Sequence, residues 1–305
     1  MPRKKESERQ VIAASTKRRP YGVRLSFLLE SSTKLNVDGE CSLLISPDYL
    51  LRIAPSKSSA RLSASDSQCW NVSVEGFATA GEAEQVGLKV SMGFLWAAVS
   101  GQYSLRLLYH TPLPCSVYDR TKRGGLRMSG SATLTISRNI NNIFEPLNRI
   151  VSSSTPADQR LLLAMELFAS ARMETTERSK FVGMVSSLEP LARQRIYDNH
   201  ELERLIEAYQ QELSESSIDQ DLRNSLRNKI DNLRVESISK AIRRLIADKL
   251  PGDADALATI NEAYGIRSRI LHDGATDADL EMKGREAEAV IRRVFEELVA
   301  DFAAP

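Results

Sequence analysis

The stretch VSSSTPADQRLLLAMELF, residues 151–168, separates two halves of the chain that differ in hydrophobic period. Its Ser, Thr and Pro residues are typical of a linker or of the start of a helix. Before this stretch the apolar residues form short runs, which is the pattern of strands, and after it they recur with the 3.6-residue period of helices. The sequence therefore predicts an α+β two-domain protein, divided near residue 150.

Residues 21–150 are expected to form a β-rich domain with one amphipathic helix. Thr79 and Glu82 have the spacing of a capping box, and the apolar residues after them predict an amphipathic helix over 80–99 that lies on the sheet. The hairpin-length connections favour antiparallel pairing. The strands are expected at 24–29, 41–45, 49–53, 69–75, 103–109 and 132–137.

Residues 151–305 are expected to form an all-α bundle of six or seven helices. Breaks between the helices are expected at Pro190, at the Ser-rich run near residue 215, at Pro251 and Gly252, and at Asp273 and Gly274. The apolar stripes run over 161–168, 181–192, 202–213, 222–233, 238–246, 257–264 and 291–302.

Charge and cysteine content narrow the classes of function. The 305 residues carry a net charge of +1, so the overall charge indicates no partner. The apolar runs are too short to cross a membrane, and the first 20 residues lack the apolar centre of a secretory signal, so a cytoplasmic location is expected. The three cysteines have no metal-binding spacing, and we expect neither a metal nor a cofactor.

Two segments of the first half are strongly basic. Residues 1–20 are expected to form a disordered arm, which either binds a nucleic acid or membrane surface or is a solvated terminus. The segment YDRTKRGGLR, residues 118–127, joins two expected strands and either contacts phosphates or is a solvated hairpin loop. Residues 151–305 contain 21 basic and 28 acidic side chains, so the second half is acidic.

Only three histidines are candidates for proton transfer near neutral pH. His110 and His200 are expected to be surface residues. His272 lies in AYGIRSRILHDG, residues 263–274, together with Arg267 and Arg269. Guanidinium groups and an imidazole at one helix end can bind a phosphodiester. Metal-free RNA cleavage needs a base, an acid and a cation that stabilises the charge of the transition state.

Helix geometry restricts how these groups act together. Arg267 and His272 lie about 140° apart around a regular helix, whereas Arg269 and His272 share a face. Arg267 and His272 converge on one phosphate if the helix tightens at Asp273 and Gly274, or if the site forms between two copies of the chain. Alternatively, both side chains only stabilise the C-terminus of the helix, where the helix dipole favours cations.

The unit RSRILH, residues 267–272, resembles the Arg-x4-His motif of the HEPN superfamily. The surrounding YGIRSRILHDG is similar to the ApeA-like branch of that superfamily, which is common in prokaryotic defence systems, and the similarity covers about residues 155–302. The resemblance implies a HEPN-like helical bundle and a metal-independent endoribonuclease, an effector in a defence or stress system. It also implies RNA as the partner, and a homodimer through the helical domain in which two Arg–His pairs face each other.

By position, the resemblance implies that His272 is the general acid or base and that Arg267 binds phosphate and stabilises the transition state. Ser268 occupies the polar position that follows the motif Arg. Glu189, in the segment SSLEPL at 186–191, either orients an Arg or is an exposed helix residue. The remaining candidates for substrate, dimer or supporting contacts are Arg269, Tyr264 and Asp273.

Two other functions stay open from the sequence. The first is a non-catalytic helical adaptor that binds RNA or a protein through the same surface, and the second is a dimerisation module. The low basic density of residues 151–305 favours both, although a local positive groove can lie on an acidic domain. The β-rich domain has no phosphate loop or nucleophile elbow. It resembles the β-rich regions that precede ApeA-like HEPN domains, and this resemblance implies that it senses or positions an unknown trigger or regulatory partner.

Overall fold

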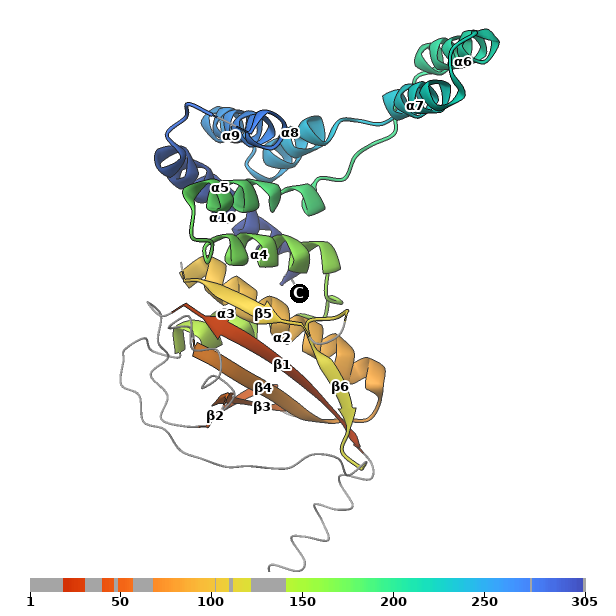
Figure 1. Cartoon of the computed structure of the whole chain (residues 1–305). Helices are drawn as coiled ribbons and strands as arrows, with labels where there is room; N and C mark the ends of the chain where they lie inside the picture. The colour runs from red at the N-terminus through yellow and green to blue at the C-terminus, as the bar shows by residue number, and fades with distance from the viewer. Residues whose placement is uncertain are drawn as a thin grey trace, which may run out of the picture.

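The computed structural model describes residues 19–30, 40–46, 49–56, 68–101, 103–109, 112–121, 141–274 and 276–303. Within these residues, an N-terminal region built on an antiparallel sheet is followed by a C-terminal helical region (Figure 1). The predicted strand at 132–137, His110, residues 122–127 of the basic loop and all but the last two residues of the N-terminal arm lie outside the described residues.

The sheet has the strand order β2-β3-β4-β1-β5, and β6 pairs with β1 on the same edge as β5. Every pairing is antiparallel, as the hairpin-length connections predict. The strand β6 was not expected, because its residues fall partly in the segment interpreted as a loop. The strands are β1 (Tyr21–Leu29), β2 (Cys41–Ser46), β3 (Tyr49–Pro55), β4 (Gln68–Phe77), β5 (Leu105–Leu108) and β6 (Ser116–Asp119).

Helix α2 (Ala80–Gly101) begins where the capping box predicts. Thr79 Oγ1 accepts a hydrogen bond from the backbone N–H of Glu82 at 3.1 Å, and Glu82 Oε2 accepts one from the N–H of Ala78 at 3.0 Å. The predicted amphipathic character holds only for the first half of α2, where Gly81 and Gln85 are exposed and Ala83 and Gly87 are buried, because every residue from Val90 to Val99 is buried. The sheet covers one side of α2, and α3 and α4 cover others, so no solvated face is left along that stretch.

A second helix, α3 (Asn141–Val151), was not predicted in the N-terminal half. It packs closely against α2, because Gly93 of α2 has no side chain to hold the two helices apart. A Cβ at Gly93 would lie 3.1 Å from Cα of Leu147. The described residues of the N-terminal half therefore contain two helices rather than the one expected.

The regular elements of the C-terminal region are helices, as the 3.6-residue period predicts, and they end at the expected breaks. Gly252 and Gly274 both adopt positive φ, 79° and 74°, at two of these ends. The helices are α4 (Gln159–Ala171), α5 (Glu177–Ser186), α6 (His200–Glu215), α7 (Gln220–Asp231), α8 (Ile238–Lys249), α9 (Ala254–Asp273) and α10 (Leu280–Phe302), with the short 3-10 helices η2 (Glu189–Leu191) and η3 (Asn232–Arg234).

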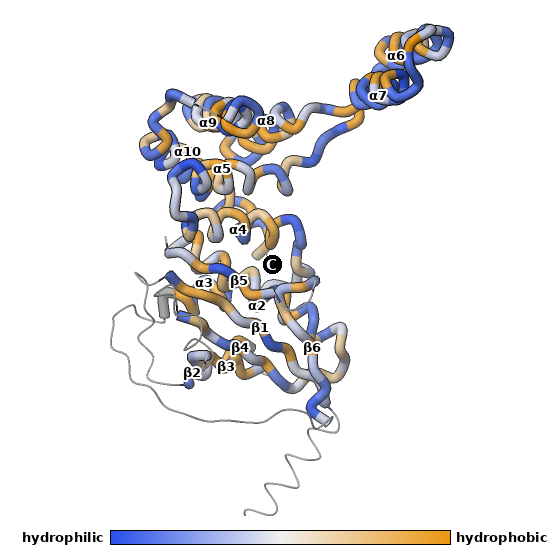
Figure 2. The backbone as a smooth tube through the Cα atoms, viewed as in Figure 1, coloured by the Kyte–Doolittle hydropathy of each residue, from blue (hydrophilic) through white to orange (hydrophobic). Residues whose placement is uncertain are grey.

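Helices α6 and α7 differ from the expected single bundle, because they form a hairpin that projects from the other helices (Figure 1). The segments that carry this hairpin meet at a bridge between Ile196 and Val235. Ile206 is the only fully buried residue of α6, and α7 has none. Four residues of the apolar stripes in this hairpin are exposed, namely Leu205, Tyr209, Leu222 and Leu233, and Figure 2 shows orange stretches along the projecting hairpin.

The two regions share one contiguous cluster of buried apolar side chains. Helix α4 packs against α2, and the rings of Phe168 in α4 and Phe295 in α10 meet edge to face at 5.5 Å. Arg292 of α10 donates hydrogen bonds to the backbone oxygens of Val99 and Ser100, each at 3.1 Å, near the end of α2. These contacts anchor the helices that hold α9. None of the described helices is both long and apolar enough to cross a membrane.

Candidate functional site

Helix α9 carries most of the residues that the sequence singled out. Asp253 caps its N-terminus by accepting a hydrogen bond from the N–H of Ala256 at 2.8 Å, and Gly274 ends it in the left-handed conformation. One side of the helix is buried against α5, α8 and α10. The buried residues are Ala256, Ile260, Ala263, Ile266 and Ile270. This apolar anchor fixes the direction of every polar side chain on the other faces of the helix.

Arg267 lies in a polar cluster formed by three elements. Its Nη2 is 2.7 Å from Oε1 of Glu189, the first residue of η2, and its Nε donates to Oγ of Ser186, the last residue of α5, at 3.1 Å. The guanidinium carbon lies 5.5 Å from the ring centre of Tyr264, one turn earlier on α9. The Arg267 side chain is only 17% exposed. These three contacts fix the orientation of the guanidinium group.

Tyr264 binds the same carboxylate as Arg267 in this cluster. Its hydroxyl donates a hydrogen bond to Oε1 of Glu189 at 3.2 Å, so one carboxylate oxygen binds both the phenol and the guanidinium. Burial, followed by the negative charge of Glu189, raises the pKa of Tyr264. The phenol therefore stays protonated near neutral pH and acts as a hydrogen-bond donor.

Of the two roles left open for Glu189, the structure has it pair with an Arg. Ser186 is a site residue that the sequence analysis did not select. The available signal was its position three residues before Glu189 at a helix end, a spacing that places two side chains on the same side.

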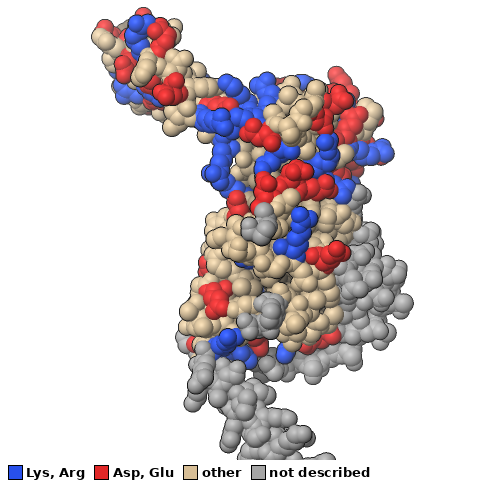
Figure 3. Space-filling view, turned by 180° about the vertical axis from the view of Figure 1, so that it is seen from behind, with Lys and Arg blue, Asp and Glu red and all other residues tan. Residues whose placement is uncertain are grey.

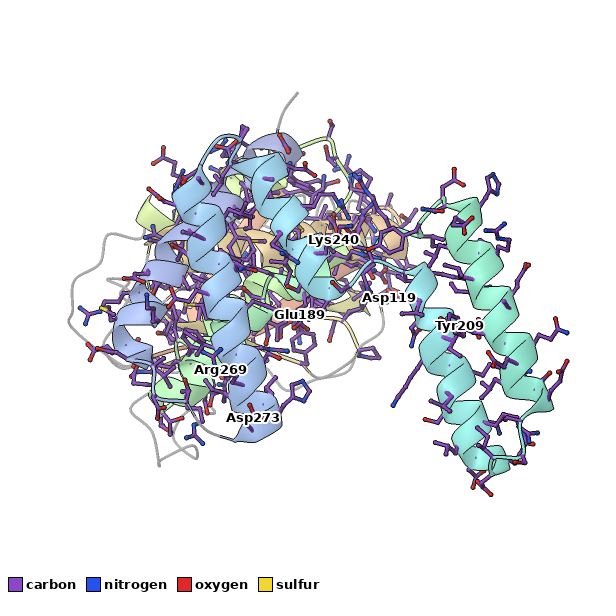
Figure 4. All side chains as sticks on the ribbon, turned by 90° about the horizontal axis from the view of Figure 1, so that it is seen from above. Asp119, Glu189, Tyr209, Lys240, Arg269 and Asp273 are labelled. Atoms are coloured by element: carbon purple, nitrogen blue, oxygen red, sulfur yellow. The ribbon has the colours of Figure 1, made fainter. Side chains whose placement is uncertain are left out.

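His272 lies on a different face of α9 from Arg267. It is solvent-exposed in the last turn, as are Arg269 and Asp273, while Ser268 is half-buried. In Figure 4, Arg269 and Asp273 lie on α9, and Glu189 lies beside this helix. The helix stays regular through Asp273, so its end does not turn His272 toward Arg267. Within one chain, the structure brings together Arg267, Tyr264 and Glu189 but not Arg267 and His272.

His200, the remaining described histidine, is exposed at the first position of α6 on the projecting hairpin. Among the described residues, no group of three or more His, Cys, Asp or Glu side chains is placed to hold a metal ion. Compared with known family models, curated proteins and solved structures, the chain matches none. The resemblance to the HEPN superfamily therefore stays a prediction from the α9 motif.

Proposed function

We propose that this chain is a metal-independent endoribonuclease of the HEPN type, with Arg267 and His272 as its reacting groups, acting in a prokaryotic defence or stress system. The observation that supports the proposal most is the placement of both residues on α9. A guanidinium of fixed orientation lies five residues before a solvent-exposed imidazole. These are the cation and the proton-transfer group that metal-free RNA cleavage needs.

In this reaction His272 takes the proton of the attacking 2′-hydroxyl or donates one to the departing 5′-oxygen. Arg267 stabilises the negative charge that gathers on the phosphate oxygens. Three side chains position Arg267. Glu189 binds its Nη2, Ser186 binds its Nε, and the ring of Tyr264 faces its guanidinium group. In the described part of the chain, Nη1 of Arg267 has no hydrogen-bond partner, so it is the nitrogen that a phosphate would contact.

The site requires two copies of the chain in this proposal. A regular helix separates Arg267 and His272 by about 140°, so a single α9 does not direct both at one phosphate. A two-fold axis beside α9 would place the His272 of one copy near the Arg267 of the other. Sedimentation at micromolar concentration should then show a species of twice the 33.9 kDa chain mass. A monomer alone would contradict the shared site.

Cleavage of a pool of labelled RNAs in the presence of EDTA tests the proposal. The wild type should cut, and His272→Ala should not, because no other described histidine lies on α9. His200→Ala is the matched control, since it removes an exposed imidazole from the projecting hairpin and should leave cleavage unchanged. Circular dichroism would check that each variant is folded. Cleavage by His272→Ala at the wild-type rate would refute the assignment.

One observation favours a second function, a non-catalytic RNA-binding adaptor. Glu189 neutralises Arg267 within the same chain, so a phosphate would have to share or displace that carboxylate. An adaptor would bind the RNA pool without turnover, and Arg269→Gln would then weaken binding and lower its salt dependence, with no cleavage to lose. Binding by the wild type with no cleavage, in the experiment above, would support the adaptor.

A further inference from the structure

The chain that leaves η2 forms, together with the start of α8, a surface that we call the neck patch, defined as Arg193, Arg195, Lys240, Arg243 and Arg244. The segment 192–197 runs alongside residues 234–236 at the base of the projecting hairpin. The backbone N–H of Glu236 donates to the oxygen of Arg195 at 2.8 Å, and Arg244 Nη2 donates to the oxygen of Arg193 at 2.5 Å. These bonds hold the two basic segments side by side.

The neck patch presents positive charge that the surrounding residues leave largely uncompensated. Its nearest acid, Glu236, is only 3% exposed and pairs with Arg244 at 2.7 Å, which lowers the pKa of that carboxyl. Arg193, Arg195 and Arg243 are exposed and form no ion pair with any residue that the structure describes. The exposed acids beside the patch in sequence are Asp198 and Asp248.

Figure 3 shows Lys and Arg side chains gathered where the projecting hairpin joins the other helices. This concentration is notable because residues 151–305 carry 28 acidic and only 21 basic side chains. A local positive surface on an acidic region attracts a polyanion more strongly than the overall charge suggests.

An aromatic ring accompanies these cations. Lys240 Nζ lies 4.8 Å from the ring centre of Tyr197 and 3.3 Å from its hydroxyl. Basic side chains that contact the backbone, combined with an aromatic side chain, are the usual composition of surfaces that bind single-stranded nucleic acid.

The neck patch is close to the candidate site on α9. Arg193 follows Glu189 by four residues, so their Cα atoms are at most about 14 Å apart. Helix α8 also packs against both η2 and α9. A strand bound along the patch would therefore reach the cluster that holds Arg267.

We propose that the neck patch binds the backbone phosphates of single-stranded RNA and guides the strand toward α9. This inference rests on the proposed ribonuclease function for its ligand, but it concerns binding alone. Because Arg193, Arg195 and Arg243 are exposed and form no ion pair within the described part of the chain, replacing them should not disturb folding.

The test measures binding of a fluorescent 20-nucleotide single-stranded RNA by anisotropy, across a range of salt concentrations. All proteins carry His272→Ala, so that cleavage does not interfere. The triple variant Arg193→Gln, Arg195→Gln, Arg243→Gln should bind about 100-fold more weakly near 0.1 M salt, and its slope of log K against log salt should be smaller by about 2.

The matched control is a triple variant with the same change in net charge, Arg178→Gln, Arg227→Gln, Lys229→Gln. These exposed residues lie on α5 and α7, outside the five residues that define the neck patch, and have no ion pair among the described residues. The control should keep nearly all of the affinity and slope.

Equal affinity and slope in the two triple variants would overturn the proposal. It would also be overturned if the His272→Ala protein without either set of three substitutions did not bind RNA. The ribonuclease assignment is tested separately, with protein in which His272 is unchanged. Normal binding there without cleavage contradicts catalysis by His272 and leaves the neck patch intact as an RNA-binding surface.

Discussion

The pairing of Glu189 with Arg267 gives a quantitative prediction. Glu189→Gln keeps the shape of the side chain and removes its charge, which leaves the Arg267 guanidinium without its carboxylate. The two side chains are 31% and 17% exposed, and the charged atoms are 2.7 Å apart. The substitution therefore leaves a largely buried cation without a counter-charge, with Ser186, the ring of Tyr264 and the amide oxygen introduced at position 189 as its neutral partners.

The magnitude follows from the exposure of the pair. Fully exposed ion pairs contribute about 0.2–1 kcal/mol, and breaking a buried pair costs about 3–5 kcal/mol. The pair formed by Glu189 and Arg267 lies between these cases, so we expect a coupling free energy of about 1–2 kcal/mol.

The assay is a double-mutant cycle, in which the free energy of unfolding in urea is measured for the wild type, Glu189→Gln, Arg267→Gln and the double variant. Glu281 and Arg285 of α10 supply the control cycle, because they form a pair at 2.9 Å with both side chains about 70% exposed. The control coupling should stay below about 0.5 kcal/mol. If the Glu189 and Arg267 substitutions were additive within about 0.3 kcal/mol, the pair would not organise the site.

Two further predictions concern the N-terminal region. Gly93→Ala should destabilise the protein by about 1–3 kcal/mol, because its Cβ would lie 3.1 Å from Cα of Leu147, whereas Gly265→Ala, where the nearest atom is 3.8 Å away, should be neutral or stabilising in the same thermal unfolding experiment. Burial, and then a hydrogen bond to Glu75, raise the pKa of Tyr118 to about 12. Its protonated phenol therefore contributes stability that is fully present below about pH 10 and is lost as the pH rises toward 12. Tyr118→Phe should flatten the fall in unfolding free energy above about pH 10, and an unchanged slope would contradict this account.

Helices and strands could be predicted from the local sequence pattern wherever only one face of the element is buried. Alternation along β1 leaves Val23, Leu25, Phe27 and Leu29 buried, so its strand pattern was readable from the chain alone. The breaks between the C-terminal helices were predictable for a similar reason, because glycine and proline act on their own backbone.

Local patterns failed where burial depends on distant segments. The sequence of α2 does not say that α3 and α4 will cover the sides left free by the sheet, so the amphipathic assignment failed for the second half of α2. The apolar stripes of α6 and α7 correctly predicted helices. They do not reveal that these helices project as a hairpin instead of joining the bundle. An apolar stripe shows which face of a helix is apolar, but it does not show which other element packs against that face.

The candidate site divides in the same way. The residue types at 264–274, and the angle of about 140° between Arg267 and His272, are properties of one helix and are set by the sequence of α9 alone. The partners of Arg267 are not determined by the sequence of α9. Ser186 and Glu189 lie about 80 residues earlier in the chain, and they reach Arg267 only because α5 and η2 pack near α9. The neck patch likewise needs two segments separated by the whole hairpin. Most helices and strands could be located from the sequence alone, because backbone preferences act between residues that are close along the chain. Which distant side chains make contact depends on the tertiary structure, because the packing of the core brings their helices together.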